Sequence, residues 1–297
     1  MTFRHLLLGA GRLIYDLIRL FLPNTIFVHG FIHRERLGYD NFNWGDDINI
    51  RMIEDISNLK VLIVNASHIY PRIARKVYCC IGSVLGHCNV GKISVWGTGF
   101  ISEDDQMWRL PERVYSVRGP LTRKKLLEQG IDCPAVYGDP ALLVSKYYHP
   151  KVEKRYKYGI IPHYSDESNA IIKAMSKRPD VLVISMQTYC HWHDIPDAVC
   201  SCEMIVSSSL HGIIVSDSYG IPNVWARFSD RLYGGNFKFL DYLESVDRDL
   251  REPIVIKGSS DLDAVLNDVS LFTVANNIDF DVIYEACPFK EHLRRFQ

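Results

Sequence analysis

Short apolar runs alternate with helical stretches along most of the chain. The first half contains five such runs, which we expect to be strands: 60–65, 77–81, 93–96, 113–117 and 135–137. The clearest helix between them is 120–129, because Pro120 suits a first helical turn and Gly130 suits the position after the last one. Strands that alternate with helices are typical of βαβ units, so we expect a mainly parallel sheet.

The same alternation resumes after a polar segment. Residues 147–157 contain a proline and a run of charges, and predict a linker between an acceptor-side domain, 1–150, and a donor-side domain, 151–297. The strands expected beyond it are 158–161, 181–186, 204–206 and 222–226. The helices expected there are 167–176, 197–202, 210–219, 236–245, 261–269 and 284–295, the last of which could pack back on the first domain. The pattern predicts an α/β fold of two Rossmann-like domains that face a cleft.

The apolar stretch 5–22 needs separate treatment. Arg12, Asp16 and Arg19 interrupt it, which argues against a helix that spans the bilayer. Its leucines recur on one side of a helix, so we expect an amphipathic helix. That helix either covers its own domain or lies on the cytoplasmic face of the inner membrane.

Composition narrows the class of protein. The net charge of −1 leaves no overall positive field for nucleic acid. The eight cysteines, several of them in apolar runs, are typical of free thiols and indicate a cytoplasmic compartment. Neither a G-x-G-x-x-G after the first strand nor a P-loop occurs, so nicotinamide and P-loop functions lack support.

Several candidate site residues follow predicted strands or precede helices. Asn43 and Asp46 precede a helical stretch, which Asp46 or Asp47 can cap. The alternative is that Asn43 and Asp46 contact sugar hydroxyls at the edge of the cleft. Ser83 and Thr98 lie in glycine-bearing turns, where backbone amides can approach an anion.

The remaining candidates are residues suited to binding an anion. Arg118 follows a strand and precedes a helix, where a guanidinium can grip a carboxylate or phosphate; the alternative is a surface arginine. The serine run 207–209 closes a strand and opens a helix, so its hydroxyls and amides offer donors to an anion. His211 follows in the first helical turn and can act as a general acid or bind phosphate. His163, just after another strand, is a further candidate.

Together and in this order, these motifs resemble the polysaccharide pyruvyl transferase family. The matching segments are 43–46, 82–85, 96–99, 117–120, 138–140 and 209–212. The resemblance implies a GT-B-like architecture and transfer of a pyruvyl group from phosphoenolpyruvate to a sugar as a cyclic ketal. It also implies that an arginine like Arg118 and a Leu-His pair like Leu210 and His211 hold the donor's anionic groups.

One position departs from the family's pattern. Ser209 stands where several members carry an arginine. Arg227 or Arg231 could supply the cation instead, or the serine hydroxyl and helix amides could suffice.

We therefore expect the following site. The donor should contact Arg118, His163, Ser208, Ser209, Leu210 and His211. The acceptor should contact Asn43, Asp46, Ser83 and Thr98. Arg118 and His211 are the expected catalytic residues and should face one shared opening, with His211 assisting phosphate departure or relaying a proton. We expect no metal and no cofactor besides phosphoenolpyruvate as co-substrate.

The expected activity is that of a transferase acting on a bacterial capsular or exopolysaccharide precursor, with a sugar acceptor that could be lipid-linked. One alternative is a sugar-nucleotide-dependent glycosyltransferase of the GT-B type, and another is a catalytically silent glycan-binding or assembly protein. Residues 190–202 hold three cysteines and two histidines, Cys190, His191, His193, Cys200 and Cys202. They lack the paired spacing usual in zinc sites, and His191 or His193 could instead contact sugar.

Overall fold

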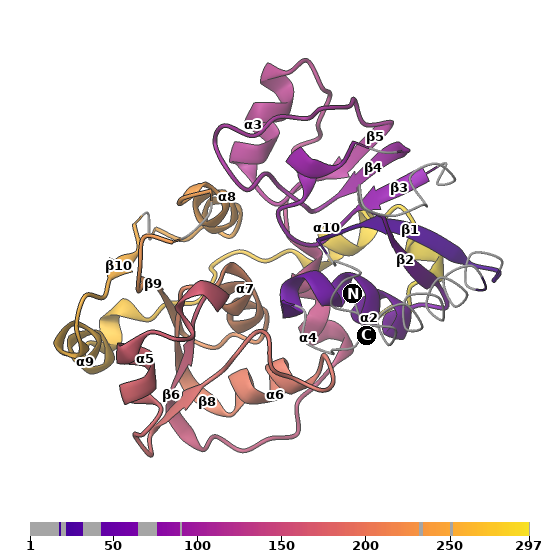
Figure 1. The fold of residues 1–297 in the computed structure, drawn as a ribbon. Helices are drawn as coiled ribbons and strands as arrows, with labels where there is room; N and C mark the ends of the chain where they lie inside the picture. Colours follow the sequence, from indigo (N-terminus) through magenta and orange to yellow (C-terminus); the bar gives the residue numbers. More distant parts are fainter. Residues whose placement is uncertain are drawn as a thin grey trace, which may run out of the picture.

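A computed structural model of the chain describes residues 18, 22–31, 43–64, 76–89, 91–231, 234–249 and 252–296. They form two five-stranded parallel sheets, one in each half of the sequence (Figure 1). The helix expected at 5–22 lies outside the described residues apart from Ile18 and Leu22. Among the described residues, no helix combines the length and apolar character needed to cross a bilayer.

The first sheet has the strand order β2-β1-β3-β4-β5. Its strands are β1 (Thr25–His29), β2 (Lys60–Val64), β3 (Lys76–Cys79), β4 (Lys92–Trp96) and β5 (Arg113–Ser116). The helical elements of this half are α2 (Trp44–Ile56), η3 (Leu85–His87), α3 (Pro120–Glu128), η4 (Pro140–Leu143) and α4 (Val144–Tyr147). The β-branched residues of the strands are largely buried, as expected for a parallel sheet covered on both faces.

The second sheet has the strand order β10-β9-β8-β6-β7. Its strands are β6 (Tyr156–Ile161), β7 (Val181–Val183), β8 (Cys202–Ser207), β9 (Asn223–Arg227) and β10 (Ile254–Val255). The helices of this half are α5 (Ala170–Met175), α6 (Asp194–Cys200), α7 (Leu210–Ser218), α8 (Phe237–Ser245), α9 (Ser259–Asn267) and α10 (Phe280–Glu285). Short 3₁₀ turns complete it: η5 (Tyr164–Asp166), η6 (Val269–Leu271) and η7 (Lys290–His292).

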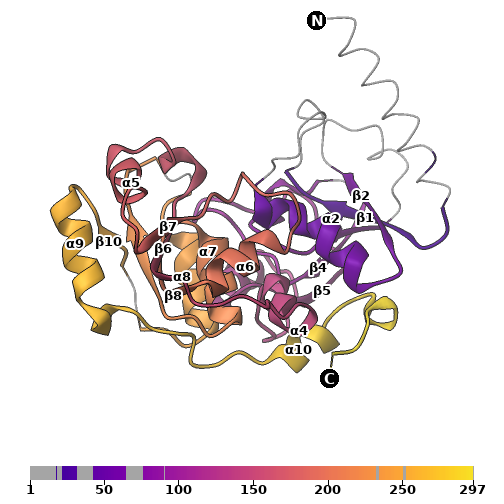
Figure 2. The same ribbon diagram turned by 90° about the horizontal axis from the view of Figure 1, so that it is seen from below.

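A continuous apolar cluster joins the two halves, because α2 packs with residues of the second half. The Trp44 backbone N–H donates to the Met186 carbonyl at 2.8 Å, and the Trp44 indole donates to the Trp192 carbonyl at 2.8 Å. Residues after 280 return to the first sheet (Figures 1 and 2). There the Phe289 ring packs edge-on against Tyr78 and Trp96.

Two expected elements differ most from the structure, besides shifts at element ends such as the strand expected at 181–186, which is β7 at Val181–Val183, and the helix expected at 197–202, which is α6 at Asp194–Cys200. The strand expected at 135–137 is reduced to one parallel bridge between Val117 and Tyr137, because the chain turns at Gly138 with a φ of 132°. The helix expected at 284–295 ends early, since Pro288 cannot continue a helix. It is replaced by α10 and the turn η7.

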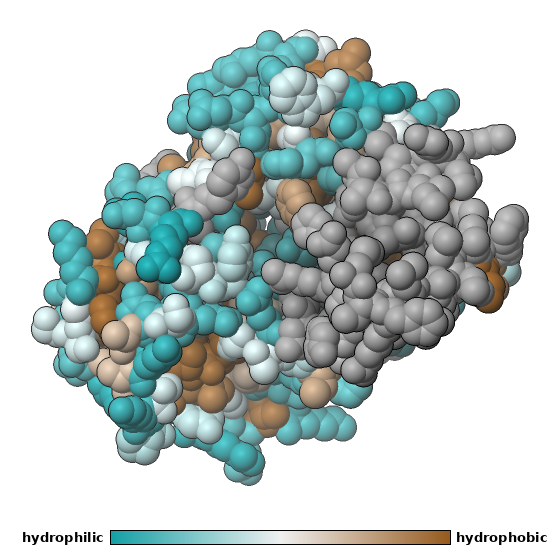
Figure 3. Space-filling view, in the orientation of Figure 1, coloured by the Kyte–Doolittle hydropathy of each residue, from teal (hydrophilic) through white to brown (hydrophobic). Residues whose placement is uncertain are grey.

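The exposed surface gives little further information about the location of a functional site. The described part of the face in Figure 3 is mostly hydrophilic, with apolar residues scattered between polar ones. Scattered exposed apolar residues are normal for a folded domain.

Candidate active site

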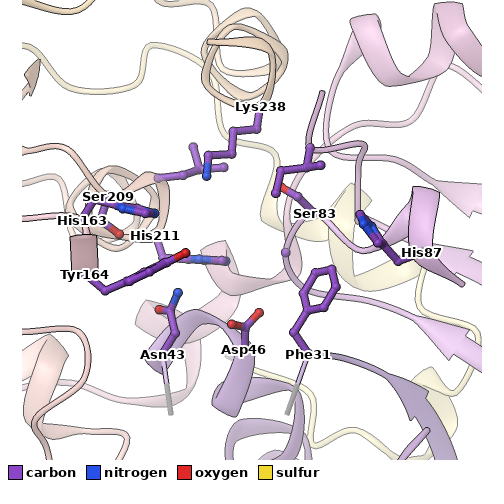
Figure 4. Close-up of a pocket in the computed structure, with 13 residues that line it drawn as sticks. Phe31, Asn43, Asp46, Ser83, His87, His163, Tyr164, Ser209, His211 and Lys238 are labelled. Atoms are coloured by element: carbon purple, nitrogen blue, oxygen red, sulfur yellow. The ribbon is translucent and has the colours of Figure 1, made fainter. Parts of the chain in front are cut away.

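A pocket of about 310 Å³ is lined by residues from both halves of the chain (Figure 4). The turns after β3, β6 and β8 contribute to it, so it lies beyond the carboxyl ends of parallel strands in both sheets. The first turns of α2, α7 and α8 supply further side chains. The lining residues are Phe31, Asn43, Asp46, Gly82, Ser83, His87, Ile101, His163, Tyr164, Ser209, Leu210, His211 and Lys238.

Most of the side chains predicted from the sequence meet in this pocket. Those that line it are Asn43, Asp46, Ser83, His163, Ser209, Leu210 and His211. Arg118, Ser208 and Thr98 do not line it. Residues far apart in the sequence therefore converge on one space, and three predicted contacts lie behind its walls.

Arg118 does not face the pocket as expected, because its side chain is fully buried in a network of its own. Its guanidinium pairs with the Asp241 carboxylate, with Nε at 3.0 Å and Nη2 at 2.9 Å from Oδ2. Nη2 also donates to the Phe100 carbonyl at 2.7 Å, and Nη1 donates to Ser83 Oγ at 2.6 Å. The sequence could not reveal this pair, since Asp241 lies on α8, 123 residues further along the chain. Arg118 reaches the pocket only through Ser83.

Thr98 and Ser208 support the pocket walls. Thr98 Oγ1 donates to the Gly82 carbonyl at 2.7 Å and accepts from the Val84 N–H at 3.3 Å. Ser208 Oγ accepts from the His163 N–H at 2.8 Å. These hydroxyls fix the backbone turns that present Ser83 and His163, so both residues lie behind the lining of the pocket.

His211 occupies a tightly packed position at the start of α7. Its ring lies against Gly45, where an added Cβ would stand 1.9 Å from Nδ1. Nε2 is buried, makes no hydrogen bond with any described residue, and lies 4.0 Å from Asp139 Oδ2. Burial, followed by the charges of Lys238 and Arg118, lowers the pKa of His211 to about 3. The imidazole is therefore neutral at neutral pH and offers one ring nitrogen as a proton acceptor.

Asp139 is the carboxylate behind His211. It accepts hydrogen bonds from the Ala141 N–H at 3.0 Å and the Gly82 N–H at 3.4 Å. Burial raises the pKa of Asp139 to about 7, although those backbone bonds and the charge of Arg118 act to lower it. A neutral imidazole and a carboxyl group that titrates near neutrality thus lie side by side. Such pairs of shifted groups are typical of sites that move protons.

The start of α2 supplies two polar side chains. Asn43 caps the helix by accepting from the Gly45 N–H at 3.3 Å, so the expectation that Asp46 or Asp47 is the cap is wrong. Asp46 lies in the first turn and lines the pocket. Burial raises the pKa of Asp46 to about 6, an effect that Lys238 partly offsets. Asp46 is therefore an ionisable group suited to accepting a proton near neutral pH.

The sequence did not single out Lys238 and Tyr164. Lys238 belongs to α8, and its ammonium points into the pocket (Figure 4). Burial and then the charge of Arg118 lower the pKa of Lys238 to about 8, while Asp46 acts to raise it. The Tyr164 ring packs against His163 with a centroid separation of 4.1 Å and is 50% exposed. A lysine within an amphipathic helix carries no signal that separates it from a surface residue.

His163 is held in place by its neighbours. Its Nδ1 lies 2.8 Å from Ser165 Oγ, which fixes the ring at the pocket edge. Burial and then Lys238 lower the pKa of His163 to about 4. Like His211, it is neutral at neutral pH and contributes no positive charge.

The other candidates lie elsewhere. Arg227 lies 3.7 Å from the Asp230 carboxylate and Arg231 contacts the Ser165 carbonyl, and neither lines the pocket. His191 and His193 line a separate groove beside α2. Among the described residues, no group of three or more His, Cys, Asp or Glu side chains is arranged to hold a metal ion.

Two relatives align with most of this chain. The chain is 32% identical over 231 residues to an uncharacterized protein, L143, of Acanthamoeba polyphaga mimivirus, covering 75% of this chain and 76% of that protein. It is 25% identical over 214 residues to the succinoglycan biosynthesis protein ExoV of Rhizobium meliloti (strain 1021), covering 69% of this chain and 61% of that protein.

Among solved structures, UDP-GlcNAc 2-epimerase from Methanocaldococcus jannaschii aligns with 11% identity and a TM-score of 0.45, covering 87% of this chain and 97% of that one. A TM-score below 0.5 supports no conclusion about a shared fold or activity. The sequence pattern of the family described as polysaccharide pyruvyl transferase matches residues 40–227, a span that includes the pocket residues from Asn43 to His211. The chain belongs to the polysaccharide pyruvyl transferase family.

Proposed function

We propose that this chain transfers a pyruvyl group from phosphoenolpyruvate to two hydroxyls of one sugar in a polysaccharide precursor, forming a cyclic ketal and releasing phosphate. One observation carries the proposal beyond family membership. A single pocket brings together an ammonium group, the amino end of a helix, a neutral imidazole and a carboxylate. These groups match a small, doubly acidic donor and a neutral polyhydroxyl acceptor.

The donor end of the pocket is formed by the start of α7 and by Lys238. The first amides of a helix lack partners within the helix and favour an anion. Ser209 and Leu210 stand at that end, and Lys238 reaches in from α8. A phosphate or carboxylate placed between them would meet hydrogen-bond donors on one side and a positive charge on the other.

The acceptor end is formed by α2 and the turn after β6. Asn43 and Asp46 offer the amide and carboxylate groups that bind sugar hydroxyls, and the half-exposed ring of Tyr164 offers a face for a sugar. With its pKa near 6, Asp46 is ionised at neutral pH and can take the proton of the attacking hydroxyl.

The proposed reaction forms two C–O bonds at C2 of phosphoenolpyruvate and releases phosphate. The first sugar oxygen bonds to C2 of phosphoenolpyruvate, while the C2–C3 π electrons take a proton at C3. The bond between C2 and the bridging oxygen of the phosphate ester then breaks, so that phosphate leaves with that oxygen. The second sugar oxygen then bonds to C2. Of the two hydroxyl protons released, one replaces the proton taken up at C3 and the other leaves with phosphate. His211 relays the second proton toward the phosphate, and an anion bound nearby raises the proton affinity of its imidazole.

The wider setting is part of the same proposal. The two sheets would act as lobes of a GT-B-like enzyme with the reaction between them. The acceptor would be a lipid-linked oligosaccharide at the cytoplasmic face of a membrane. In this scheme neither a metal nor an organic cofactor takes part, since the ammonium and the oriented amides stabilise the developing charge.

A direct assay tests the proposal. The purified chain is incubated with phosphoenolpyruvate and a panel of lipid-linked oligosaccharides, and the products are followed by mass spectrometry and by phosphate release. We expect phosphate release that depends on acceptor, with a product heavier by one pyruvyl ketal. Glycosyl transfer from a nucleotide sugar would show the GT-B glycosyltransferase alternative to be correct. Glycan binding without any phosphate release would favour the silent binding protein.

A further inference from the structure

We propose that Lys238 supplies the positive charge that binds the anionic group of the donor in this chain. The identity of the donor rests on the proposed function, whereas the charge of the site rests only on the pocket. Arg118, the cation expected from the sequence, is not placed to contact an anion in the pocket. That guanidinium is fully buried among Asp241, Phe100 and Ser83 and does not line the pocket.

Lys238 is the only lysine or arginine among the described residues that line the pocket. Its ammonium lies within ion-pair distance of no carboxylate among the residues that the structure describes. Its neighbours His163 and His211 are neutral, because burial lowers the pKa values of both below 5. Among the described lining residues, Lys238 is therefore the basic side chain that stays charged beside the neutral imidazoles of His163 and His211.

The position of Lys238 is fixed by the rest of α8. Asp241 lies one helical turn later and accepts from the Thr122 N–H at 2.8 Å and from Thr122 Oγ1 at 2.7 Å, as well as from Arg118. These buried contacts clamp α8 to the start of α3. Lys238, on the same helix, is thereby held over the pocket, and Arg118 acts as a positioning residue for it.

The geometry suits one anion held from two sides. Figure 4 shows the Lys238 ammonium pointing into the space between Ser209 and His211 on one side and Ser83 on the other. The amino end of α7 lies at Ser209. A tetrahedral dianion there would accept from the ammonium and from the helix amides together, which is the arrangement that gives strong charge-assisted bonds.

Inorganic phosphate, the expected product, is the probe for this site. The Kd of phosphate is measured by isothermal titration calorimetry for the native chain and for Lys238→Met, Lys238→Arg and Lys124→Met. Lys124 is an exposed lysine of α3 and serves as the matched control. We expect Lys238→Met to weaken phosphate about 10- to 100-fold, Lys238→Arg to retain most of the affinity, and Lys124→Met to have no effect.

A second substitution tests whether the charge itself is what matters. Ser209 lines the same pocket, so Ser209→Arg in the Lys238→Met background should restore part of the phosphate affinity. The same variants are assayed for KM and kcat with phosphoenolpyruvate. Loss of Lys238 should raise KM more than it lowers kcat, with partial recovery in the double variant. Circular dichroism and thermal unfolding confirm that each variant is folded.

The outcomes separate this inference from the proposed function. Unchanged phosphate affinity in Lys238→Met, or no phosphate binding by the native chain, overturns the role of Lys238. If phosphate binding depends on Lys238 but phosphoenolpyruvate is not turned over, the anion site stands and phosphoenolpyruvate is refuted as the donor. Normal turnover of phosphoenolpyruvate by Lys238→Met supports phosphoenolpyruvate as the donor and refutes the role of Lys238 in binding it.

Discussion

At the scale of single residues, His211 is the most constrained group of the pocket. Its Nε2 is buried and unpartnered among the described residues, 4.0 Å from Asp139, and an unpartnered buried nitrogen is costly unless a ligand or proton uses it. His211→Ala should lower kcat by about two to four powers of ten, the usual scale for a proton-transfer group. Stopped assays of phosphate release measure this. Turnover close to that of the native chain, with an unchanged melting temperature, would remove His211 from the mechanism.

The pH dependence of kcat/KM is also decided by single residues. Asp46 must be ionised to accept a proton, so activity falls as the pH drops through about 6. Lys238 must be protonated to hold an anion, so activity falls as the pH rises through about 8. The charged or titratable groups that act on Lys238 or share its pocket are Arg118, Asp46, His87, His163, Tyr164 and His211. Burial keeps His163 and His211 neutral between these limits.

We therefore expect a bell-shaped profile of kcat/KM with limbs near these two values. Ionisation of the donor's own phosphate is the same for every variant, so comparison between variants isolates the enzyme groups. Lys238→Arg should move the alkaline limb upward, because a guanidinium stays charged throughout this range. An alkaline limb that is unchanged in Lys238→Arg would assign that limb to another group.

At the scale of elements, the contact between α2 and α7 sets the position of His211. Gly45 leaves room for the imidazole, and a Cβ there would collide with it. Gly45→Ala should displace the ring and reduce kcat/KM by about 100-fold, the scale of a misplacement of about 1 Å. Gly30→Ala is the matched control, since a Cβ there meets Ile63 at an ordinary 3.5 Å. Equal activity in both variants would mean that the ring position does not matter.

The tie between α3 and α8 is a second element-scale feature. Asp241 and Arg118 form a fully buried pair, and removing one partner leaves a buried charge uncompensated. Asp241→Ala should lower the free energy of unfolding by about 3–5 kcal/mol, measured by urea denaturation. The double variant Arg118→Met/Asp241→Leu should recover much of that loss. A double variant as unstable as Asp241→Ala alone would contradict the ion-pair explanation.

The elements also show how much of the fold and of the candidate site the sequence patterns could predict. Apolar runs located strands such as β2, β4 and β8, and the turns after strands together with the starts of α2 and α7 held seven predicted residues that do line the pocket. Arg118 matched a motif, but a motif does not reveal a buried partner 123 residues away in the sequence. Lys238 could not be predicted, because its role depends on how α8 is clamped over the pocket rather than on its local pattern.

At the scale of the whole molecule, the chain's last residues connect the halves. Phe289 packs edge-on against Tyr78 and Trp96, and the Trp96 indole donates to the Ile283 carbonyl at 2.9 Å. The predicted long helix would not have placed Phe289 there, whereas the turn after Pro288 does. Because this segment leaves the second sheet and returns to the first, its packing contributes to the stability of both.

Phe289→Ala therefore tests whether the molecule unfolds as one unit. Loss of this buried ring should cost about 3–5 kcal/mol of unfolding free energy. Since the apolar cluster runs continuously from α2 to α7, the loss should lower one common transition. Urea unfolding followed by circular dichroism and by tryptophan fluorescence measures it, because Trp96 and Trp225 report on different sheets. Two separated transitions, with only the first-sheet signal destabilised, would show that the halves fold independently and that the pocket between them is assembled from two separately stable parts.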